Sequence, residues 1–258
     1  MLRPLLIAVQ FMTRLPLPKN ILQETDYQPE QLGKSVVMYP VVGLIIGAML
    51  VLILMGLNAF APQLQAIVVA ALILFSWALL TGALHLDGLS DSADAWIGGY
   101  GNKDKTLAIM KDPYCGPAGV SIIVITLLVK FAALTTVIGQ SWVSLLIAPV
   151  MARSAVIVLF MSTSYVRKDG IGASHAEHLP QFLAWLMLGL VVLGCGYFLQ
   201  VKVLWLLLAV GLVFLLLRYL MMNRIGGTTG DTAGAVVEVI EVVVLLVFAL
   251  SPLPMGEG

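Results

Sequence analysis

Long apolar segments separated by short polar gaps dominate the chain. A helix that crosses a bilayer needs about 20 mostly apolar residues. Seven windows meet this requirement, at residues 36–60, 64–86, 117–138, 141–164, 180–199, 203–222 and 233–251. The pattern therefore predicts an all-α fold, a polytopic transmembrane helix bundle with about seven spans. The fourth window is the weakest of the seven, because Pro149 and Arg153 interrupt it.

The N-terminal region has a different pattern. An apolar run follows Met1 and ends at Arg14, so it is too short to cross a bilayer. A short apolar helix of this kind can lie along the membrane surface. We therefore expect an N-terminal interfacial helix within a cytoplasmic arm of residues 1–35, as part of one integral membrane domain over residues 1–258.

Composition supports a membrane environment. Of the 258 residues, 60% are hydrophobic and 11% are charged, whereas a soluble domain carries about 25% charged residues. The formal net charge is zero and there is no polybasic tract, which argues against a nucleic-acid partner. Membrane lipid is the expected surrounding.

The basic residues predict an orientation, because cytoplasmic loops of membrane proteins carry an excess of Lys and Arg. With a cytoplasmic N-terminus and seven alternating spans, the cytoplasmic side carries Arg3, Arg14, Lys19, Lys34, Lys103, Lys105, Lys111, Arg167, Lys168, Arg218 and Arg224. The opposite side carries Lys202 alone. The same assignment places the long polar loops in the cytoplasm, at residues 87–116, 165–179 and 223–232. The chemistry of the protein is therefore expected on that side.

The most conspicuous polar motif follows the second window. Asp87, Asp91 and Asp94 are spaced i, i+4 and i+7, so a helix would place them on one stripe. Three carboxylates near a membrane repel one another, and a divalent cation such as Mg²⁺ would remove this penalty while also binding substrate phosphates. Gly88 would leave room for a phosphate. His85 lies about opposite the stripe, which favours a buried, hydrogen-bonded histidine.

Two other polar loops carry candidate groups. Lys111 and Asp112 precede a turn rich in Pro and Gly. Lys111 could contact a phosphate and Asp112 a metal or a hydroxyl, although an ordinary solvated loop explains the pair equally well. His175 and His178 are three residues apart, like a metal-binding pair, but we expect them in a solvated loop.

A glycine-rich turn precedes the last window. Residues 223–235 contain Arg224, four glycines and Asp231. Free backbone N–H groups at the start of a helix can hold an anion, so this turn is a candidate phosphate site. Asp231, at the mouth of the predicted helix, is the best candidate here for chemistry.

The charged residues Lys130, Arg153, Glu238 and Glu241 lie inside the predicted spans, away from their cytoplasmic edges. Acidic side chains in a membrane face the protein interior and are functional by default, which makes Glu238 and Glu241 candidates. The alternative is that they pair with Lys130 or Arg153 and hold the helices together. Arg153 itself could bind a phosphate or one of these acids, and the sequence leaves both interpretations open.

Taken with these motifs, the chain resembles the cobalamin synthase family, the adenosylcobinamide-GDP ribazoletransferases. The run from Gly82 to Asp94, with its HLDGLSDSAD core, resembles the family's acidic motif. Further resemblances lie at residues 11–16, 39–47, 109–112 and 226–241. The chain departs from the family where Pro113 and Tyr114 replace a frequent Ser-Arg pair, so a phosphate role does not transfer to that point.

The resemblance implies a multi-pass enzyme of the bacterial inner membrane that joins alpha-ribazole, or its 5′-phosphate, to adenosylcobinamide-GDP and releases GMP. It also implies Mg²⁺ as cofactor, held by Asp87, Asp91 and Asp94. Asp231 would be a further ligand or the general base, and Asp94 a second catalytic candidate. The expected substrate and phosphate contacts are Lys111, Asp112, Arg153, Arg224 and Gly88. Secondary candidates are Glu238, Glu241, Arg14 and His85. Formation of a homo-oligomer stays open.

Two other classes of membrane protein share parts of this pattern. A CDP-alcohol phosphatidyltransferase also uses spaced aspartates on membrane helices, but its motif has an Asp three residues before the Asp-Gly pair, where this chain has Leu84. An ion-coupled transporter could use Glu238, Glu241 and Arg153 as its pathway. A transporter does not need three cytoplasmic aspartates beside glycine-rich phosphate loops.

Overall fold

The computed structural model describes residues 2–16, 27–167 and 171–250, and the regular structure of these residues is helical. The first six helices are α1 (Leu2–Met12), α2 (Pro29–Val37), α3 (Tyr39–Phe60), α4 (Ala66–Thr81), α5 (Leu84–Gly98) and α6 (Lys103–Ile109). The remainder are α7 (Pro117–Val137), α8 (Val143–Ser162), α9 (Ile171–Glu177), α10 (Gln181–Leu199), the 3₁₀ turn η2 (Gln200–Lys202), α11 (Val203–Ile225) and α12 (Gly230–Leu250). The predicted all-α fold is confirmed.

In the described part of the chain, five helical segments are long and apolar enough to cross a membrane, and the bent pair of α4 and α5 adds a sixth. One of the five, Gln181–Ile225, has 45 residues. As one straight helix it would be about 68 Å long, twice the hydrocarbon thickness of a bilayer. It consists instead of α10 and α11, which are separated by η2 and pack on α8 and α12, respectively. If α10 and α11 are counted as two passes, the number of membrane-spanning segments rises from six to seven. The seven segments overlap the seven windows that the sequence predicts.

The second predicted span differs from expectation. The sequence predicts one span over residues 64–86, but α4 ends at Thr81 and α5 leaves at an angle of 86°. Gly82 and Ala83 both have positive φ, at 61° and 56°. The continuous apolar pattern did not reveal this break, because it rests on two successive left-handed residues. The break directs the acidic helix α5 across the bundle toward α12.

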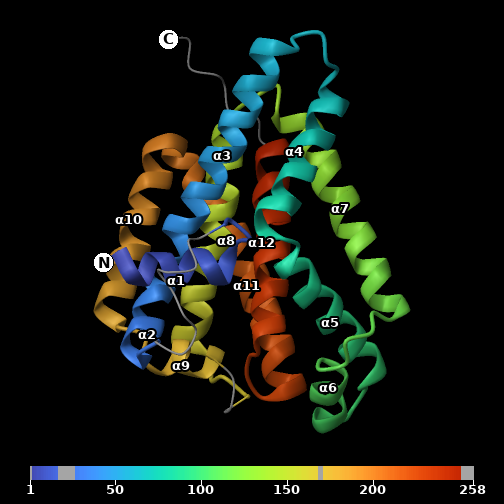
Figure 1. Ribbon diagram of the computed structural model, residues 1–258, viewed down its shortest axis with the longest axis vertical. Helices are drawn as coiled ribbons and strands as arrows, with labels where there is room; N and C mark the ends of the chain where they lie inside the picture. The colour runs from blue at the N-terminus through green and yellow to red at the C-terminus, as the bar shows by residue number, and fades with distance from the viewer. Residues whose placement is uncertain (1, 17–26, 168–170, 251–258) are drawn as a thin grey trace.

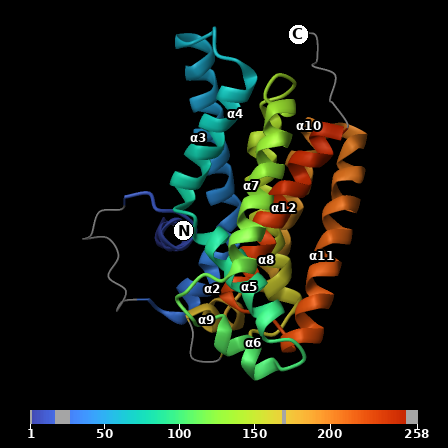
Figure 2. The same ribbon diagram turned by 90° about the vertical axis from the view of Figure 1, so that its right-hand side faces the viewer.

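Helices α8 and α12 form the centre of the bundle (Figures 1 and 2). In α8, 72% of the apolar window is buried, against 17% for the segment that contains α10 and α11. These two outer helices expose large apolar side chains, as a lipid-facing surface requires. Examples are Phe182, Trp185, Leu193, Leu204, Trp205 and Leu212.

Helices α3 and α8 approach each other closely at two glycines. A Cβ on Gly43 would lie 2.5 Å from the carbonyl oxygen of Pro149, and a Cβ on Gly47 would lie 2.7 Å from that of Leu145. Small residues allow such close backbone contact between membrane helices. Pro149 lies inside α8, which is continuous from Val143 to Ser162. The weak fourth window is therefore a helix.

A buried ion network joins α7, α8 and α12. The Nζ atom of Lys130 lies 2.9 Å from an oxygen of Glu238 and also contacts Glu241, while Arg153 pairs with Glu241. Each of the four residues is at most 3% exposed. The ammonium group of Lys130 also lies 4.6 Å from the centre of the Trp77 ring. Of the alternatives that the sequence left open, the structure therefore shows ion pairs that hold helices together.

The polar segments gather at one end of the molecule. α6, α9 and the start of α12 lie at the lower end in Figures 1 and 2. α1 runs across the long axis of the bundle, packs against α2 and α3, and buries Ile7, Ala8 and Met12. This arrangement agrees with the interfacial helix that the sequence predicts. It also brings the three predicted cytoplasmic loops to the same end.

Candidate functional site

The site is built on a close crossing of α5 and α12. A Cβ on Gly88 would lie 2.7 Å from the carbonyl oxygen of Asp231, and a Cβ on Gly234 would lie 3.4 Å from the backbone of His85. The two glycines therefore let the helix backbones touch. The sequence predicted that Gly88 leaves room for a phosphate, whereas the structure uses this space for α12. As a result, the aspartates of α5 lie beside Asp231.

Four carboxylates form one electrostatic cluster. Asp91 is close enough to Asp87, Asp94 and Asp231 for repulsion with all three, and Asp231 also interacts with Asp87. Asp87 is exposed, whereas Asp91, Asp94 and Asp231 are half-buried. The predicted stripe on α5 is thus present, and Asp231 joins it from a distant part of the sequence. Among these side chains, repulsion favours the binding of a cation.

Arg167 is the cation that faces this cluster. Its Nη1 atom lies 2.9 Å from Oδ2 of Asp231. The Nε and Nη2 atoms of Arg167 are buried and have no hydrogen-bond partner among residues 2–16, 27–167 and 171–250. A guanidinium group offers several N–H donors in a fixed plane that matches a phosphate. Arg167 can therefore hold Asp231 with one nitrogen and an anionic substrate group with the others.

A short backbone pairing brings Arg167 to the site. Tyr165 and Thr228 form a parallel bridge, with Val166 N–H donating to the carbonyl of Thr228 at 2.8 Å. The Thr228 N–H in turn donates to Ser164 O at 2.9 Å. At Gly227 a Cβ would lie 2.3 Å from that same oxygen, so only glycine fits there. From the sequence alone Arg167 is one more basic residue of a cytoplasmic loop, because no local pattern predicts a pairing over this separation.

The start of α12 is held by its own threonines. The Thr229 N–H donates to Oγ1 of Thr232 at 2.8 Å, and the Thr232 N–H donates to Oγ1 of Thr229 at 3.2 Å. This reciprocal pattern is that of a capping box. It fixes the first turn of α12, which carries Asp231. The glycine-rich turn that the sequence singled out is therefore an ordered helix start beside the acidic cluster.

Asp94 has a different environment from the one that the sequence predicted. Its two carboxylate oxygens accept hydrogen bonds from the N–H groups of Gly116 and Gly119, at 2.6 and 2.9 Å. These donors belong to the start of α7, where a carboxylate stabilises free N–H groups and the helix dipole. Asp94 therefore ties α5 to α7, and its oxygens are already engaged.

The predicted phosphate contacts are dispersed. Lys111 and Asp112 are exposed, and Asp112 accepts a hydrogen bond from the backbone of Tyr114 at 3.0 Å. Arg224 donates to the carbonyl oxygen of Trp96 and lies against the Trp96 ring. Arg153 is engaged in the ion network. None of these four side chains is paired with the acidic cluster in the described structure, whereas Arg167 is paired with Asp231 there.

Arg14 lies at the break between α4 and α5. Its backbone N–H donates to Leu80 O at 3.0 Å, and its side chain covers Gly82. It therefore anchors the end of α1 to the break. The candidate Arg14 therefore contacts Leu80 and Gly82, which directly precede the acidic helix α5.

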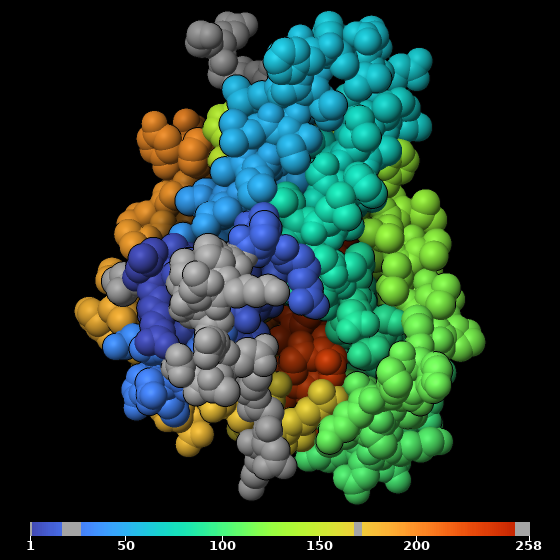
Figure 3. Space-filling model, viewed as in Figure 1, coloured from blue at the N-terminus to red at the C-terminus, as the bar shows by residue number. Residues whose placement is uncertain are grey.

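A pocket lies beside the cluster, toward the middle of the bundle. Its volume is about 230 Å³. The lining residues come from both ends of the sequence and comprise Phe11, Met12, Tyr39, Leu84, His85, Val156, Phe160, Tyr165, Gly172, His175, Gly230, Ala233, Gly234 and Val237. Figure 3 shows a hollow with α12, in red, at its floor and blue N-terminal atoms at its edge.

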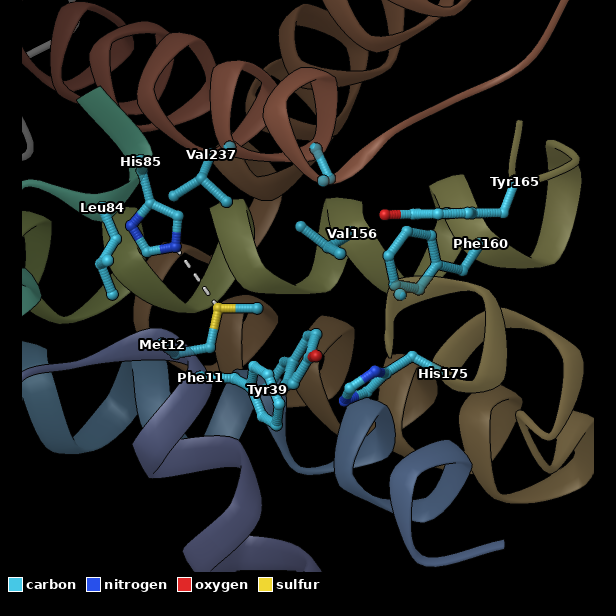
Figure 4. Close-up of a pocket in the computed structure, with 14 residues that line it drawn as sticks. Phe11, Met12, Tyr39, Leu84, His85, Val156, Phe160, Tyr165, His175 and Val237 are labelled. Atoms are coloured by element: carbon cyan, nitrogen blue, oxygen red, sulfur yellow. Dashed lines mark hydrogen bonds between the residues drawn. The ribbon is translucent and has the colours of Figure 1, made fainter. Parts of the chain in front are cut away.

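Two histidines line this pocket. The Nε2 atom of His85 lies 3.4 Å from the sulfur of Met12, and the residue is 5% exposed, which confirms the expected buried and hydrogen-bonded histidine (Figure 4). His175 was expected in a solvated loop, and that expectation is wrong. His175 is 3% exposed, and its ring packs edge-on against the ring of Phe11, with 4.8 Å between the two ring centres. The contact with α1 is long-range, so local polarity did not reveal it.

The donor set fits Mg²⁺ in its chemistry. In the ranges that the structure describes, no group of three or more His, Cys, Asp or Glu side chains forms a preformed metal site. Mg²⁺ commonly takes one or two carboxylates and completes its shell with water and substrate phosphates. Asp87, Asp91 and Asp231 offer such oxygens beside the free N–H groups of Arg167. The residues are consistent with a site that forms together with a phosphate-bearing substrate.

These features define a polytopic membrane protein of the helix-bundle class, with an acidic site at one end of the bundle. The family model described as cobalamin-5-phosphate synthase matches residues 4–249. The chain belongs to this family, whose members are transferases of cobalamin biosynthesis.

Curated relatives match over nearly the whole chain. A protein of Stutzerimonas stutzeri is 49% identical over 248 residues, which cover 96% of this chain and 98% of the relative. A protein of Pseudomonas fluorescens is 46% identical over 248 residues, covering 96% and 99%. Both are named adenosylcobinamide-GDP ribazoletransferase. No solved structure matches the chain.

Proposed function

We propose that the protein joins alpha-ribazole, or its 5′-phosphate, to adenosylcobinamide-GDP and releases GMP. The observation that carries the proposal is the cluster of Asp87, Asp91 and Asp231 opposite Arg167, in a chain whose full-length relatives carry the name of this reaction. A carboxylate cluster facing one guanidinium suits the transfer of a phosphate-linked group between two large substrates.

In the proposed reaction, a hydroxyl oxygen of the ribose attacks the phosphorus next to cobinamide. A phosphorus–oxygen bond forms to the ribose, and the bond between that phosphorus and the bridging oxygen of GMP breaks. GMP leaves with the bonding electrons, and the hydroxyl proton passes to a base. The product is adenosylcobalamin, or its 5′-phosphate when the phosphorylated nucleoside is the acceptor.

Each residue of the site has a separate role in the proposed reaction. Asp87 and Asp91 would hold Mg²⁺, which when bound supplies positive charge to the pyrophosphate. Asp231 is the candidate base or third ligand, and the capping threonines fix its position. Arg167 binds a phosphate oxygen with its unpaired N–H groups. Asp94 positions α7 against α5.

The proposal includes a cellular setting. The N-terminus and the acidic site face the cytoplasm of a bacterium, and the bundle lies in the inner membrane. The gathering of the basic loops at the end that carries the site supports this orientation. The substrates are phosphorylated and water-soluble, so a cytoplasmic site is also where they are available.

Turnover by the purified protein tests the proposal. Wild type in detergent, supplied with Mg²⁺ and both substrates, is expected to release GMP and form a completed cobamide, which chromatography separates. Asp91→Asn should lose at least about a hundredfold in kcat. Asp104→Asn, which changes an exposed acid of α6, is the matched control and should keep its activity. Absence of product from well-folded wild type would contradict the proposal.

A further inference from the structure

We infer that the pocket between α1, α3, α5, α8, α9 and α12 binds the flat heteroaromatic base of the nucleoside acceptor. This inference rests on the proposed function and names the part of the substrate that the pocket takes. In alpha-ribazole the base is 5,6-dimethylbenzimidazole, a bicycle with two methyl groups and a single unsubstituted ring nitrogen. The remaining parts of the two substrates differ from it in size and polarity.

The position of the pocket supports this assignment. Gly230, in its wall, precedes Asp231 in the first turn of α12. His85, on the facing helix, lies less than one turn before Asp87 and Gly88. A base held in the pocket therefore places its attached ribose at the acidic cluster. This is where the attacking hydroxyl must lie.

The wall of the pocket suits a flat apolar ring. In Figure 4, Val156 and Val237 lie on one side, and Phe11, Tyr39 and His175 lie on the other. The ring of Phe11 contacts that of His175, and Tyr39 lies within 6.4 Å of the same ring. Aromatic and aliphatic faces of this kind bind planar rings by packing and by edge-to-face contacts. Most of the wall is apolar, and its polar side chains are two histidines and two tyrosines: His85, His175, Tyr39 and Tyr165.

The other candidate occupants fit less well. Guanine and adenine carry amino and ring N–H or carbonyl groups around their edges, and each group left unpaired in an apolar pocket opposes binding. The corrin ring is far larger than a cavity of about 230 Å³, which is itself smaller than the pockets that hold drug-sized ligands. A dimethylbenzimidazole presents mainly carbon to the wall.

Filling the pocket gives the first test. Val237→Phe places a larger side chain into the cavity from α12. We expect the KM for alpha-ribazole to rise about tenfold or more, with a smaller rise for the nucleoside of unsubstituted benzimidazole. The KM for adenosylcobinamide-GDP should stay within about twofold. The matched control is Val243→Phe, at a half-buried position on the same helix outside the pocket, which should leave both constants unchanged.

Enlarging the pocket gives a second test that does not depend on the folding of the first variant. Val156→Ala should shift preference toward a nucleoside with a larger base, such as naphthimidazole. The ratio of kcat/KM for the two nucleosides is measured within one preparation, so it is independent of the folded fraction. A rise in this ratio by several-fold supports the pocket. An unchanged ratio overturns the inference.

Binding of alpha-ribazole alone separates this inference from the proposed function. Calorimetric titration of wild type with the nucleoside, without the corrinoid, should show binding that Val237→Phe weakens about tenfold. If wild type binds the nucleoside but forms no cobamide, the proposed function fails and the pocket stands. If product forms but Val237→Phe raises the KM of adenosylcobinamide-GDP instead, the pocket holds a guanine or adenine and the inference fails.

Discussion

At the scale of single residues, the proposed chemistry depends on a pair, Arg167 and Asp231, that the sequence did not connect. The aspartate stripe and Asp231 were visible as motifs, because their spacing and their place at the ends of apolar windows are local features. Arg167 was not, because it reaches Asp231 through the bridge between Tyr165 and Thr228. Asp94 shows the opposite case, since a convincing place on the stripe proved to be a cap for α7.

The role of Arg167 leads to a prediction about activity. Arg167→Ala removes both the contact to Asp231 and the free donors, so we expect kcat/KM to fall about a hundredfold. Arg167→Lys keeps the charge but loses the planar fork, and should restore only part of the loss. Steady-state rates of GMP release measure both variants. Arg3→Ala, an exposed arginine of α1, is the control. Equal activity of Arg167→Ala and wild type would remove Arg167 from the site.

At the scale of helices, the apolar windows correctly predicted which helices exist and in what order. They did not predict where a helix bends. Hydrophobicity marks where a helix is stable in lipid. It does not mark the break at Gly82 and Ala83, where two left-handed residues turn the chain by 86°. The intramembrane charges were also ambiguous from sequence. Whether Arg153 meets Glu241 or a phosphate depends on how α8 and α12 pack, which is a tertiary property.

The crossing of α5 and α12 predicts a sharp response at Gly88. Alanine normally stabilises a helix relative to glycine by about 1 kcal/mol. In Gly88→Ala, however, the new Cβ would meet the backbone of Asp231, so α5 must move away from α12 and activity should fall at least about tenfold. Gly56→Ala in α3 is the matched control, because its Cβ would enter open space. Rates and thermal stability in detergent compare the two. Full activity of Gly88→Ala would show that the crossing does not position the site.

At the scale of the whole molecule, the bundle separates an apolar, lipid-facing body from one polar end that carries the acidic cluster and Arg167. The charge asymmetry of the sequence was sufficient to predict which loops would gather. The pocket was not predictable, because its wall combines residues from α1 through α12 and exists only once the bundle has packed. Its histidines were accordingly interpreted from local sequence, correctly for His85 and wrongly for His175.

The orientation can be measured with a cysteine that the chain already has. Cys115 is exposed near the polar end, whereas Cys195 is buried. A membrane-impermeant maleimide should label Cys115 in inside-out vesicles and leave it unlabelled in intact spheroplasts. In a Cys115→Ser background, Gln63→Cys at the opposite end should show the reverse pattern. Labelling of Cys115 from outside would place the site on the wrong side of the membrane.

The most direct test of the central claim follows one phosphorus atom. Adenosylcobinamide-GDP is labelled with radioactive phosphorus at the phosphate next to cobinamide and incubated with the purified protein, Mg²⁺ and alpha-ribazole. We predict that the label appears in the completed cobamide and that the released GMP is unlabelled. The proposed transfer would be contradicted if the label appeared in a free nucleotide, if cobinamide without label were released, or if the substrate were recovered intact.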